Sequence, residues 1–126
     1  MPNPAEHLFP GRSLGDEEAS RLAERMAALA TASRVKLMYA LLGGELAVDQ
    51  LAEKTGLTPN AVSQQLRPLR HLRMVVGRRD GRTVRYRLHD AHIADLLAAI
   101  RHQHEHADRG WAEPAPNAAR GADVGA

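Results

Sequence analysis

The chain has 126 residues, which is enough for one domain with a buried core and too few for two. It has no cysteine, so disulfides, thiolate metal ligands and a cysteine nucleophile are excluded. An aromatic content of 3% argues against a binder of single-stranded nucleic acid, because such proteins stack bases on aromatic rings. The net charge is +2, yet the segment 58–87 alone has +7 and the remainder has −5. Positive charge concentrated in one segment is typical of a surface that binds a polyanion.

Proline and glycine punctuate both ends of the chain, so we expect flexible tails over 1–14 and 109–126 and one domain over 15–108. No apolar run approaches the length of a membrane span, and the first residues do not have the plan of a signal peptide. We therefore expect a cytoplasmic protein without a membrane partner. The spacing of apolar residues predicts a first helix over 16–30 and a second over 32–42.

The next segment has the pattern of a helix-turn-helix. Residues 48–55 are predicted to form a short helix, and Gly56 supplies the turn. Thr58 caps a longer helix that begins at Pro59 and ends at about Leu72. Apolar side chains at helical spacing would face inward, and polar side chains of the kind that contact base edges and phosphates would face outward. We assign the following residues of this recognition helix to DNA contact: Thr58, Asn60, Ser63, Gln64, Gln65 and Arg67.

A β-hairpin is predicted directly after the recognition helix. The runs 75–79 and 83–88 flank Asp80-Gly81, a dipeptide that favours a two-residue hairpin turn. We interpret this hairpin as a wing whose Arg79, Arg82 and Arg85 contact the DNA backbone or the minor groove. Affinity for DNA should fall steeply with salt, because contacts with phosphates dominate it.

A last helix is predicted to begin at Asp90. Its apolar residues recur at helical spacing before a polar end that is rich in histidine. Such a stripe on a terminal helix is expected to pair with a partner, so we predict that the first and last helices form a two-fold dimer interface. His102 precedes His106 by four residues, which places both on one face. The chain has no recognisable Ser-His-Asp triad and no glycine-rich phosphate-binding loop, so an enzyme is not expected.

The order of these elements and several motifs resemble the ArsR/SmtB family of bacterial winged-helix repressors over about 16–106. The motifs are Glu45-Leu46, the run Ala61-Val62-Ser63-Gln64-Gln65-Leu66, and the hairpin from Val75-Val76-Gly77 to Tyr86-Arg87-Leu88. The resemblance implies a mainly α fold with a small β-hairpin, a winged helix-turn-helix. It also implies a homodimer that represses transcription from an inverted-repeat operator in double-stranded DNA. Many members of the family release this operator when a metal ion binds.

The last helix is similar to that of the nickel- and cobalt-sensing members of the family, in which ligands at the start of one helix meet ligands at the end of the partner's helix. The resemblance implies ligands at Asp90, His92 and His106. Because His102 reaches His106 at i+4, a slightly re-phased site of Asp90, His92, His102 and His106 is geometrically possible. Nitrogen and oxygen ligands suit nickel, cobalt or zinc. Gln103 stands where the family pattern has a ligand, which favours an alternative in which the dimer binds DNA but receives its signal from a co-regulator protein. In a second alternative, the chain is a metal buffer or interaction module that does not bind DNA.

The chain departs from the family pattern in three respects. Members that sense soft metals have cysteines in the third helix, where this chain has Ala47 and Asp49. Pro68 lies late in the recognition helix and cannot donate a hydrogen bond to the Gln64 carbonyl, so we expect it to bend the helix. Arg73 stands where relatives have the glycine that ends this helix, which predicts a strained or reshaped turn.

Overall fold

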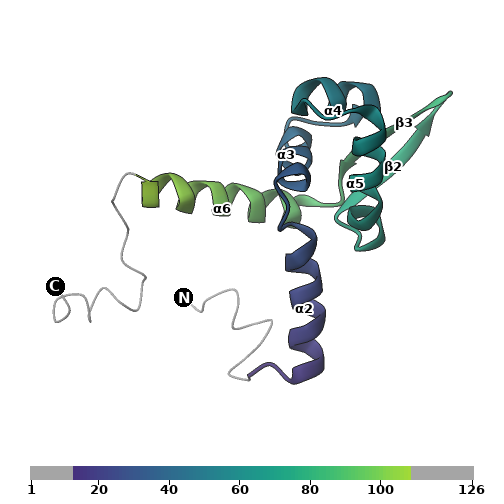
Figure 1. Ribbon diagram of the computed structural model, residues 1–126. Helices are drawn as coiled ribbons and strands as arrows, with labels where there is room; N and C mark the ends of the chain where they lie inside the picture. Colours follow the sequence, from purple (N-terminus) through teal and green to yellow (C-terminus); the bar gives the residue numbers. More distant parts are fainter. Residues whose placement is uncertain (1–12, 109–126) are drawn as a thin grey trace.

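A computed structural model describes residues 13–108, so nearly all of the two expected tails lies outside the described residues. The chain forms a small helical body from which a β-hairpin and two helices project (Figure 1). The elements are, in chain order, α2 (Asp16–Ala28), α3 (Ala32–Leu41), β1 (Leu46–Ala47), α4 (Val48–Thr55), α5 (Pro59–His71), β2 (Val75–Asp80), β3 (Thr83–Leu88) and α6 (Ala91–Asp108). The fold is therefore mainly α with a small antiparallel sheet, as expected.

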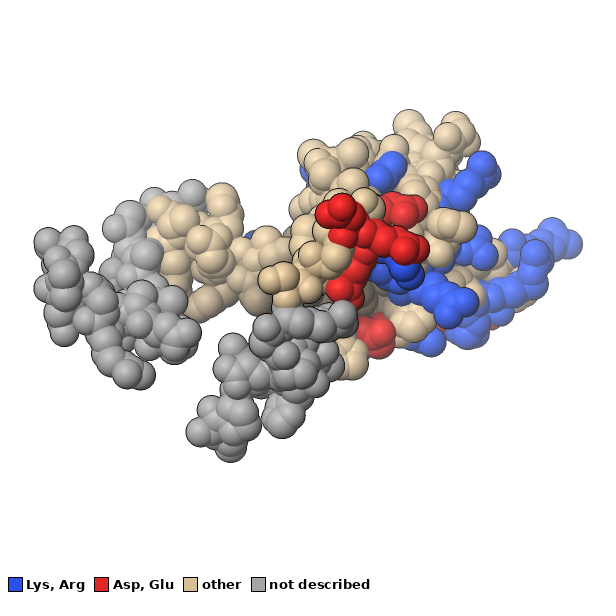
Figure 2. Space-filling model, turned by 90° about the horizontal axis from the view of Figure 1, so that it is seen from below, with Lys and Arg blue, Asp and Glu red and all other residues tan. Residues whose placement is uncertain are grey.

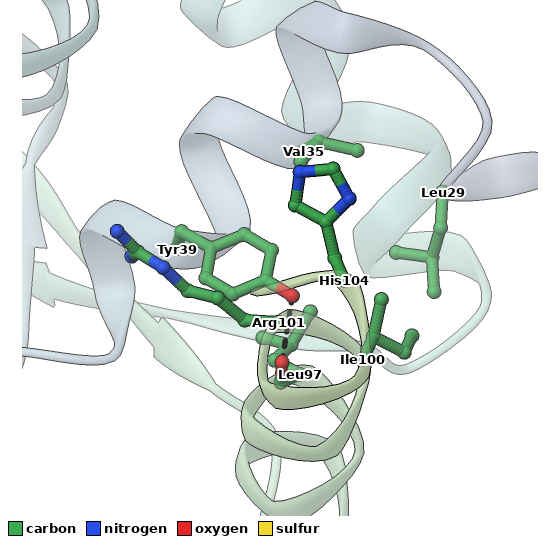
Figure 3. A pocket seen from close by; sticks show the side chains of 7 residues that line it. All are labelled: Leu29, Val35, Tyr39, Leu97, Ile100, Arg101 and His104. Atoms are coloured by element: carbon green, nitrogen blue, oxygen red, sulfur yellow. Dashed lines mark hydrogen bonds between the residues drawn. The ribbon is translucent and has the colours of Figure 1, made fainter. Parts of the chain in front are cut away.

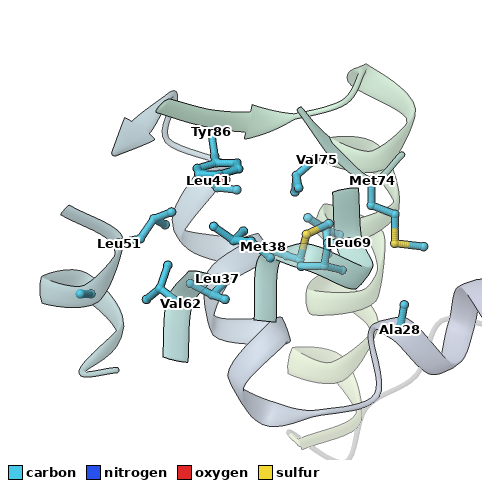
Figure 4. Close-up of a cluster of buried hydrophobic side chains, with 13 residues drawn as sticks. Ala28, Leu37, Met38, Leu41, Leu51, Val62, Leu69, Met74, Val75 and Tyr86 are labelled. Atoms are coloured by element: carbon cyan, nitrogen blue, oxygen red, sulfur yellow. The ribbon is translucent and has the colours of Figure 1, made fainter. Parts of the chain in front are cut away.

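The core lies where α3, α4 and α5 pack together beneath the sheet (Figure 4). The largest fully buried side chains come from these three helices: Leu37, Met38, Leu51, Val62, Leu66 and Leu69. Tyr86 and Val75 close the core from the sheet. Burial of one such aliphatic side chain stabilises the fold by about 1.5–3 kcal/mol relative to its exposure. The inward face predicted for the recognition helix is confirmed, and this burial orients its opposite face toward solvent.

The sheet has three strands in the order β1-β3-β2, and all pairs are antiparallel. Asp80 pairs with Thr83, so the two-residue turn is Gly81-Arg82 and not the expected Asp80-Gly81. Gly81 has a φ of 64°, the left-handed conformation that glycine adopts without steric cost. The Thr83 hydroxyl also donates to the Asp80 carbonyl at 2.9 Å. Strand β2 therefore extends one residue beyond its predicted end at Arg79, and the turn consists of Gly81 and Arg82.

The recognition helix α5 continues past Pro68 to His71 and ends in a Schellman motif. The Met74 amide donates to the Leu69 carbonyl at 2.8 Å, and the Arg73 amide donates to the Arg70 carbonyl at 3.0 Å. This motif requires a left-handed residue, and Arg73 has a φ of 58°. The predicted strain at Arg73 is thus confirmed, because a residue with a Cβ adopts this conformation at a cost.

The helices α2 and α6 leave the body in different directions (Figure 1). Helix α2 ends at Ala28, two residues before the expected end, and α6 begins directly after Asp90. Both carry apolar side chains that this chain does not cover: Met26 is 70% exposed, Leu96 45% and Ile100 49%. In residues 13–108, no helix has the length and apolar character needed to cross a membrane.

Candidate DNA-binding surface and metal ligands

The N-terminal half of α5 presents an exposed polar face. Thr58 is the N-cap, and its hydroxyl accepts a hydrogen bond from the Ala61 amide at 3.1 Å. Pro59 occupies the first helical position, where its missing N–H costs nothing. The predicted contact residues that are exposed on this helix are Asn60, Ser63, Gln64 and Arg67. These hydrogen-bonding side chains occupy one face of a rigid helix whose other face is buried in the core.

Gln65 differs from the other predicted contact residues. It is half-buried, and its Oε1 accepts a hydrogen bond from the Arg34 Nε at 2.9 Å. The same guanidinium donates through Nη1 to the Ala28 carbonyl at 3.3 Å. Arg34 therefore joins the end of α2 to the middle of the recognition helix. Sequence reasoning missed this role, because the two partners are 31 residues apart and no local pattern relates them.

Four of the five wing arginines fall into two groups. Arg79 and Arg82 are exposed near the turn and form no ion pair within residues 13–108. Arg78 and Arg85 instead share the carboxylate of Glu45, at 2.6 Å from Arg78 Nη2 and 3.2 Å from Arg85 Nε. The hydrogen bond from Arg78 holds the pKa of the Glu45 carboxyl below its usual range, against the opposing effect of desolvation. Arg85, a predicted DNA contact, thus has a partner within its own chain.

The basic side chains gather at the end of the molecule from which the wing projects. Figure 2 shows lysine and arginine side chains on that side, acidic side chains near the middle, and mostly uncharged residues toward α6. The polar face of α5 lies beside this basic region, because α5 packs directly against β2. A helix and a ribbon that together present positive charge can follow the phosphates of a duplex while the helix reaches base edges.

Two of the four predicted metal ligands lie at the start of α6. Asp90 caps the helix through Oδ1, which accepts from the Ile93 amide at 3.1 Å. The Nδ1 atom of His92 lies 3.6 Å from the same oxygen. The Nδ1 atom of His89 lies 2.9 Å from Oδ2. The hydrogen bonds from His89 and from the Ile93 amide hold the pKa of the Asp90 carboxyl below its usual range.

The other two predicted ligands lie near the end of α6. The imidazole rings of His102 and His106 are 3.9 Å apart between centroids, which confirms that they share one face. Ten residues separate His92 from His102, or roughly 15 Å along a helix. One protomer therefore does not bring the four residues together, and among residues 13–108 no three His, Cys, Asp or Glu side chains form a metal-binding group. The predicted ligands instead form two pairs at opposite parts of α6.

The fold and the basic surface define a winged helix-turn-helix DNA-binding protein. Residues 31–76 match the family described as "Bacterial regulatory protein, arsR family". The chain is 41% identical over 109 residues to the HTH-type transcriptional regulator NmtR of Mycobacterium tuberculosis, which covers 86% of this chain and 91% of the relative. The chain belongs to the arsR family of bacterial regulatory proteins; it is a transcriptional regulator and not an enzyme.

Solved structures agree with this assignment. The chain is 30% identical to the AntR antimony-specific transcriptional repressor, with a TM-score of 0.71 over 86% of this chain and 97% of that one. It is 27% identical to the homodimeric winged helix-turn-helix DNA-binding domain Mb0332 of Mycobacterium bovis, with a TM-score of 0.68 over 83% of this chain and 98% of that one. The winged-helix prediction is confirmed.

Proposed function

We propose that this chain acts in the cytoplasm as a homodimeric repressor that binds an inverted-repeat operator in double-stranded DNA and responds to a divalent metal ion. The observation that carries the proposal is the exposed polar face of α5 beside the arginine-rich wing. In each half-site, Asn60, Ser63, Gln64 and Arg67 would contact base edges and phosphates. Thr58 lies at the helix N-terminus, where its backbone can approach a phosphate. Arg79 and Arg82 would contact the flanking backbone or minor groove.

Support for a dimer through α2 and α6 comes from the apolar surface that these helices leave open. A groove of about 390 Å³ lies between the α2–α3 junction and α6 (Figure 3). Its residues include Leu29, Val35 and Ile100, and the Tyr39 hydroxyl fixes its floor by donating to the Leu97 carbonyl at 2.6 Å. Mb0332 is described as homodimeric. To read two half-sites one helical turn apart, such a dimer has to place its two copies of α5 about 34 Å apart.

The proposed metal ligands fit a site between two protomers. Antiparallel α6 helices would bring Asp90 and His92 of one protomer near His102 and His106 of its partner. Three imidazoles and one carboxylate suit nickel, cobalt or zinc, whereas the antimony named for AntR favours thiolates, which a chain without cysteine lacks. A bound ion would supply positive charge that joins the two helices. Asp90 would supply the negative charge of the site.

The DNA-binding part is tested by titrating a duplex that carries an inverted repeat with the metal-free dimer. We expect that changing both Gln64 and Arg67 to alanine weakens binding at least tenfold, because each bidentate base contact contributes about 1–3 kcal/mol. Arg21→Ala is the matched control, since Arg21 is an exposed arginine on α2 that pairs with Glu17. Equal binding by the double variant and the wild type would contradict the assignment of α5 as the recognition helix.

The metal-binding part is tested by titrating nickel, cobalt and zinc into the dimer, with DNA affinity measured in parallel. We expect tight binding that His92→Ala and His106→Ala each abolish, because each residue contributes to a different half of the site. His71→Ala removes an exposed histidine at the end of α5 and should leave metal binding unchanged.

Gln103 favours one alternative, in which the dimer binds DNA but its signal comes from a co-regulator protein. Micromolar metal binding that neither histidine substitution changes would support this alternative. Negligible affinity for any duplex at all salt concentrations would instead support a metal buffer or interaction module.

A further inference from the structure

Glu45 connects the wing to the helix-turn-helix. It directly precedes β1, which pairs with β3 and leads without a break into α4. Its carboxylate receives two hydrogen bonds from Arg78 and one from Arg85, and its carbonyl accepts a further one from Arg85 at 3.3 Å. The Glu45 side chain is 25% exposed and that of Arg85 is 28% exposed, so this pair is partly shielded from water. The contacts therefore join β2 and β3 to the segment that enters α4.

The pleat of the sheet separates the wing arginines by face. Arg78 lies directly opposite Arg85 in the pairing of β2 with β3, so both project from the same face, toward Glu45. Arg79 projects from the other face, which it shares with Tyr86. The guanidinium carbon of Arg70 on α5 lies over the Tyr86 ring, 5.8 Å from the centroid of that ring. The face that carries Arg79 is thus the face that packs against the recognition helix.

The position of Arg78 opposite Arg85 would destabilise the hairpin without an acid between them, because like charges at directly opposed positions repel. Glu45 offsets this repulsion and engages the donors of both guanidinium groups. A DNA phosphate that approached these donors would have to displace a carboxylate that already holds them. Arg79 and Arg82 have no such competitor within residues 13–108.

We propose that Glu45 is a positioning residue that fixes the wing relative to the helix-turn-helix and keeps Arg78 and Arg85 away from the DNA phosphates, so that the wing contacts DNA through Arg79 and Arg82. This inference rests on the proposed DNA-binding function. It assigns four of the five arginines of the wing to two different tasks, which the sequence alone does not distinguish.

The salt dependence of duplex binding separates the two tasks, because each phosphate contact contributes about 0.9 to the slope of log K against log salt concentration. In a dimer, Arg79→Gln and Arg82→Gln should each reduce the magnitude of the slope by about 1.8. Arg78→Gln and Arg85→Gln remove the same charge and should leave the slope within about 0.5 of wild type. Equal reductions by all four substitutions would overturn the proposal.

The Glu45→Gln variant tests the role of the carboxylate itself. Release of two arginines in each protomer should make the slope steeper by at least about 1 and reduce the preference for the operator over a random duplex. Glu53→Gln, which removes an exposed acid from α4, is the control for net charge. In a background with Arg78→Gln and Arg85→Gln, the substitution of Glu45 should have no further effect. A slope for Glu45→Gln equal to that of Glu53→Gln would overturn the proposal.

Two outcomes distinguish this inference from the function on which it rests. If the wild type binds no duplex in a salt-dependent manner, the DNA-binding function itself fails and this inference fails with it. If the wild type binds but the arginine variants do not divide into two groups, only the role of Glu45 is refuted. The four arginine variants decide the question if Glu45→Gln does not fold.

Discussion

Replacement of Arg73 by glycine should stabilise the protein. Arg73 holds a φ of 58° at the end of the recognition helix, and its side chain forms no hydrogen bond within residues 13–108. The left-handed conformation costs a residue with a Cβ about 1–2 kcal/mol, and glycine avoids this cost. Glycine also loses more backbone freedom on folding, which offsets about 0.5–1 kcal/mol of the gain. The net increase in the free energy of unfolding should therefore be about 0.5–1 kcal/mol.

Arg73→Ala is the matched control, because it removes the same charge and side chain but keeps the left-handed strain. Thermal and urea unfolding should be measured at one fixed protomer concentration, since dimer formation makes Tm depend on concentration. We expect Arg73→Gly to unfold about 2–6 °C above Arg73→Ala. The reasoning is refuted if the glycine variant unfolds at the same temperature as the alanine variant or below it.

Three further changes test other parts of the fold. Gly77→Ala should destabilise the hairpin by about 1–3 kcal/mol in urea unfolding, because the new Cβ would lie 3.1 Å from the Tyr86 ring. Tyr39→Phe should lower the free energy of unfolding by about 0.5–1.5 kcal/mol, since it removes the hydrogen bond to the Leu97 carbonyl; an unchanged value would show that this bond contributes nothing. The lowered pKa of Asp90 stabilises the fold at pH values above the unfolded pKa, and this contribution is lost as the pH falls through the folded pKa. Asp90→Asn keeps an N-cap and should therefore show a smaller fall in Tm than wild type below about pH 4.5.

Local signals predicted the helix-turn-helix closely. The expected helix over 48–55 has the same bounds in the structure, and α5 begins at Pro59 as expected. The end of α4 and the start of α5 are each determined by an adjacent residue. Gly56 is the C-cap of α4 in the left-handed conformation, and Thr58 is the N-cap of α5. By contrast, β1 was not predicted, because its two residues become a strand only through pairing with β3, about 40 residues later. The turn of the wing was misplaced by one residue for the same reason, since strand pairing overrides dipeptide preference.

The candidate DNA-binding surface was predicted as far as helical periodicity allows. Periodicity places Asn60 and Gln64 on the exposed face of α5, and both are exposed. It does not reveal that Gln65 accepts a hydrogen bond from Arg34, or that Glu45 holds Arg85. These contacts join residues that are 31 and 40 positions apart, so their existence depends on packing of the whole domain. For the proposed metal ligands, the sequence indicated the residue types, whereas the length of α6 separates Asp90 and His92 from His102 and His106 within one chain.

The sheet order β1-β3-β2 leaves β2 at an open edge. An uncovered strand presents unpaired N–H and C=O groups, to which strands of other molecules can add, and such additions lead to aggregation. Arg78 and Arg79 disfavour pairing of β2 with the β2 strand of a second copy, because such pairing would bring like positive charges close together. Charge on the wing thus also protects solubility, and a variant in which both arginines are neutral should aggregate more readily than the wild type in low salt, where the repulsion is least screened.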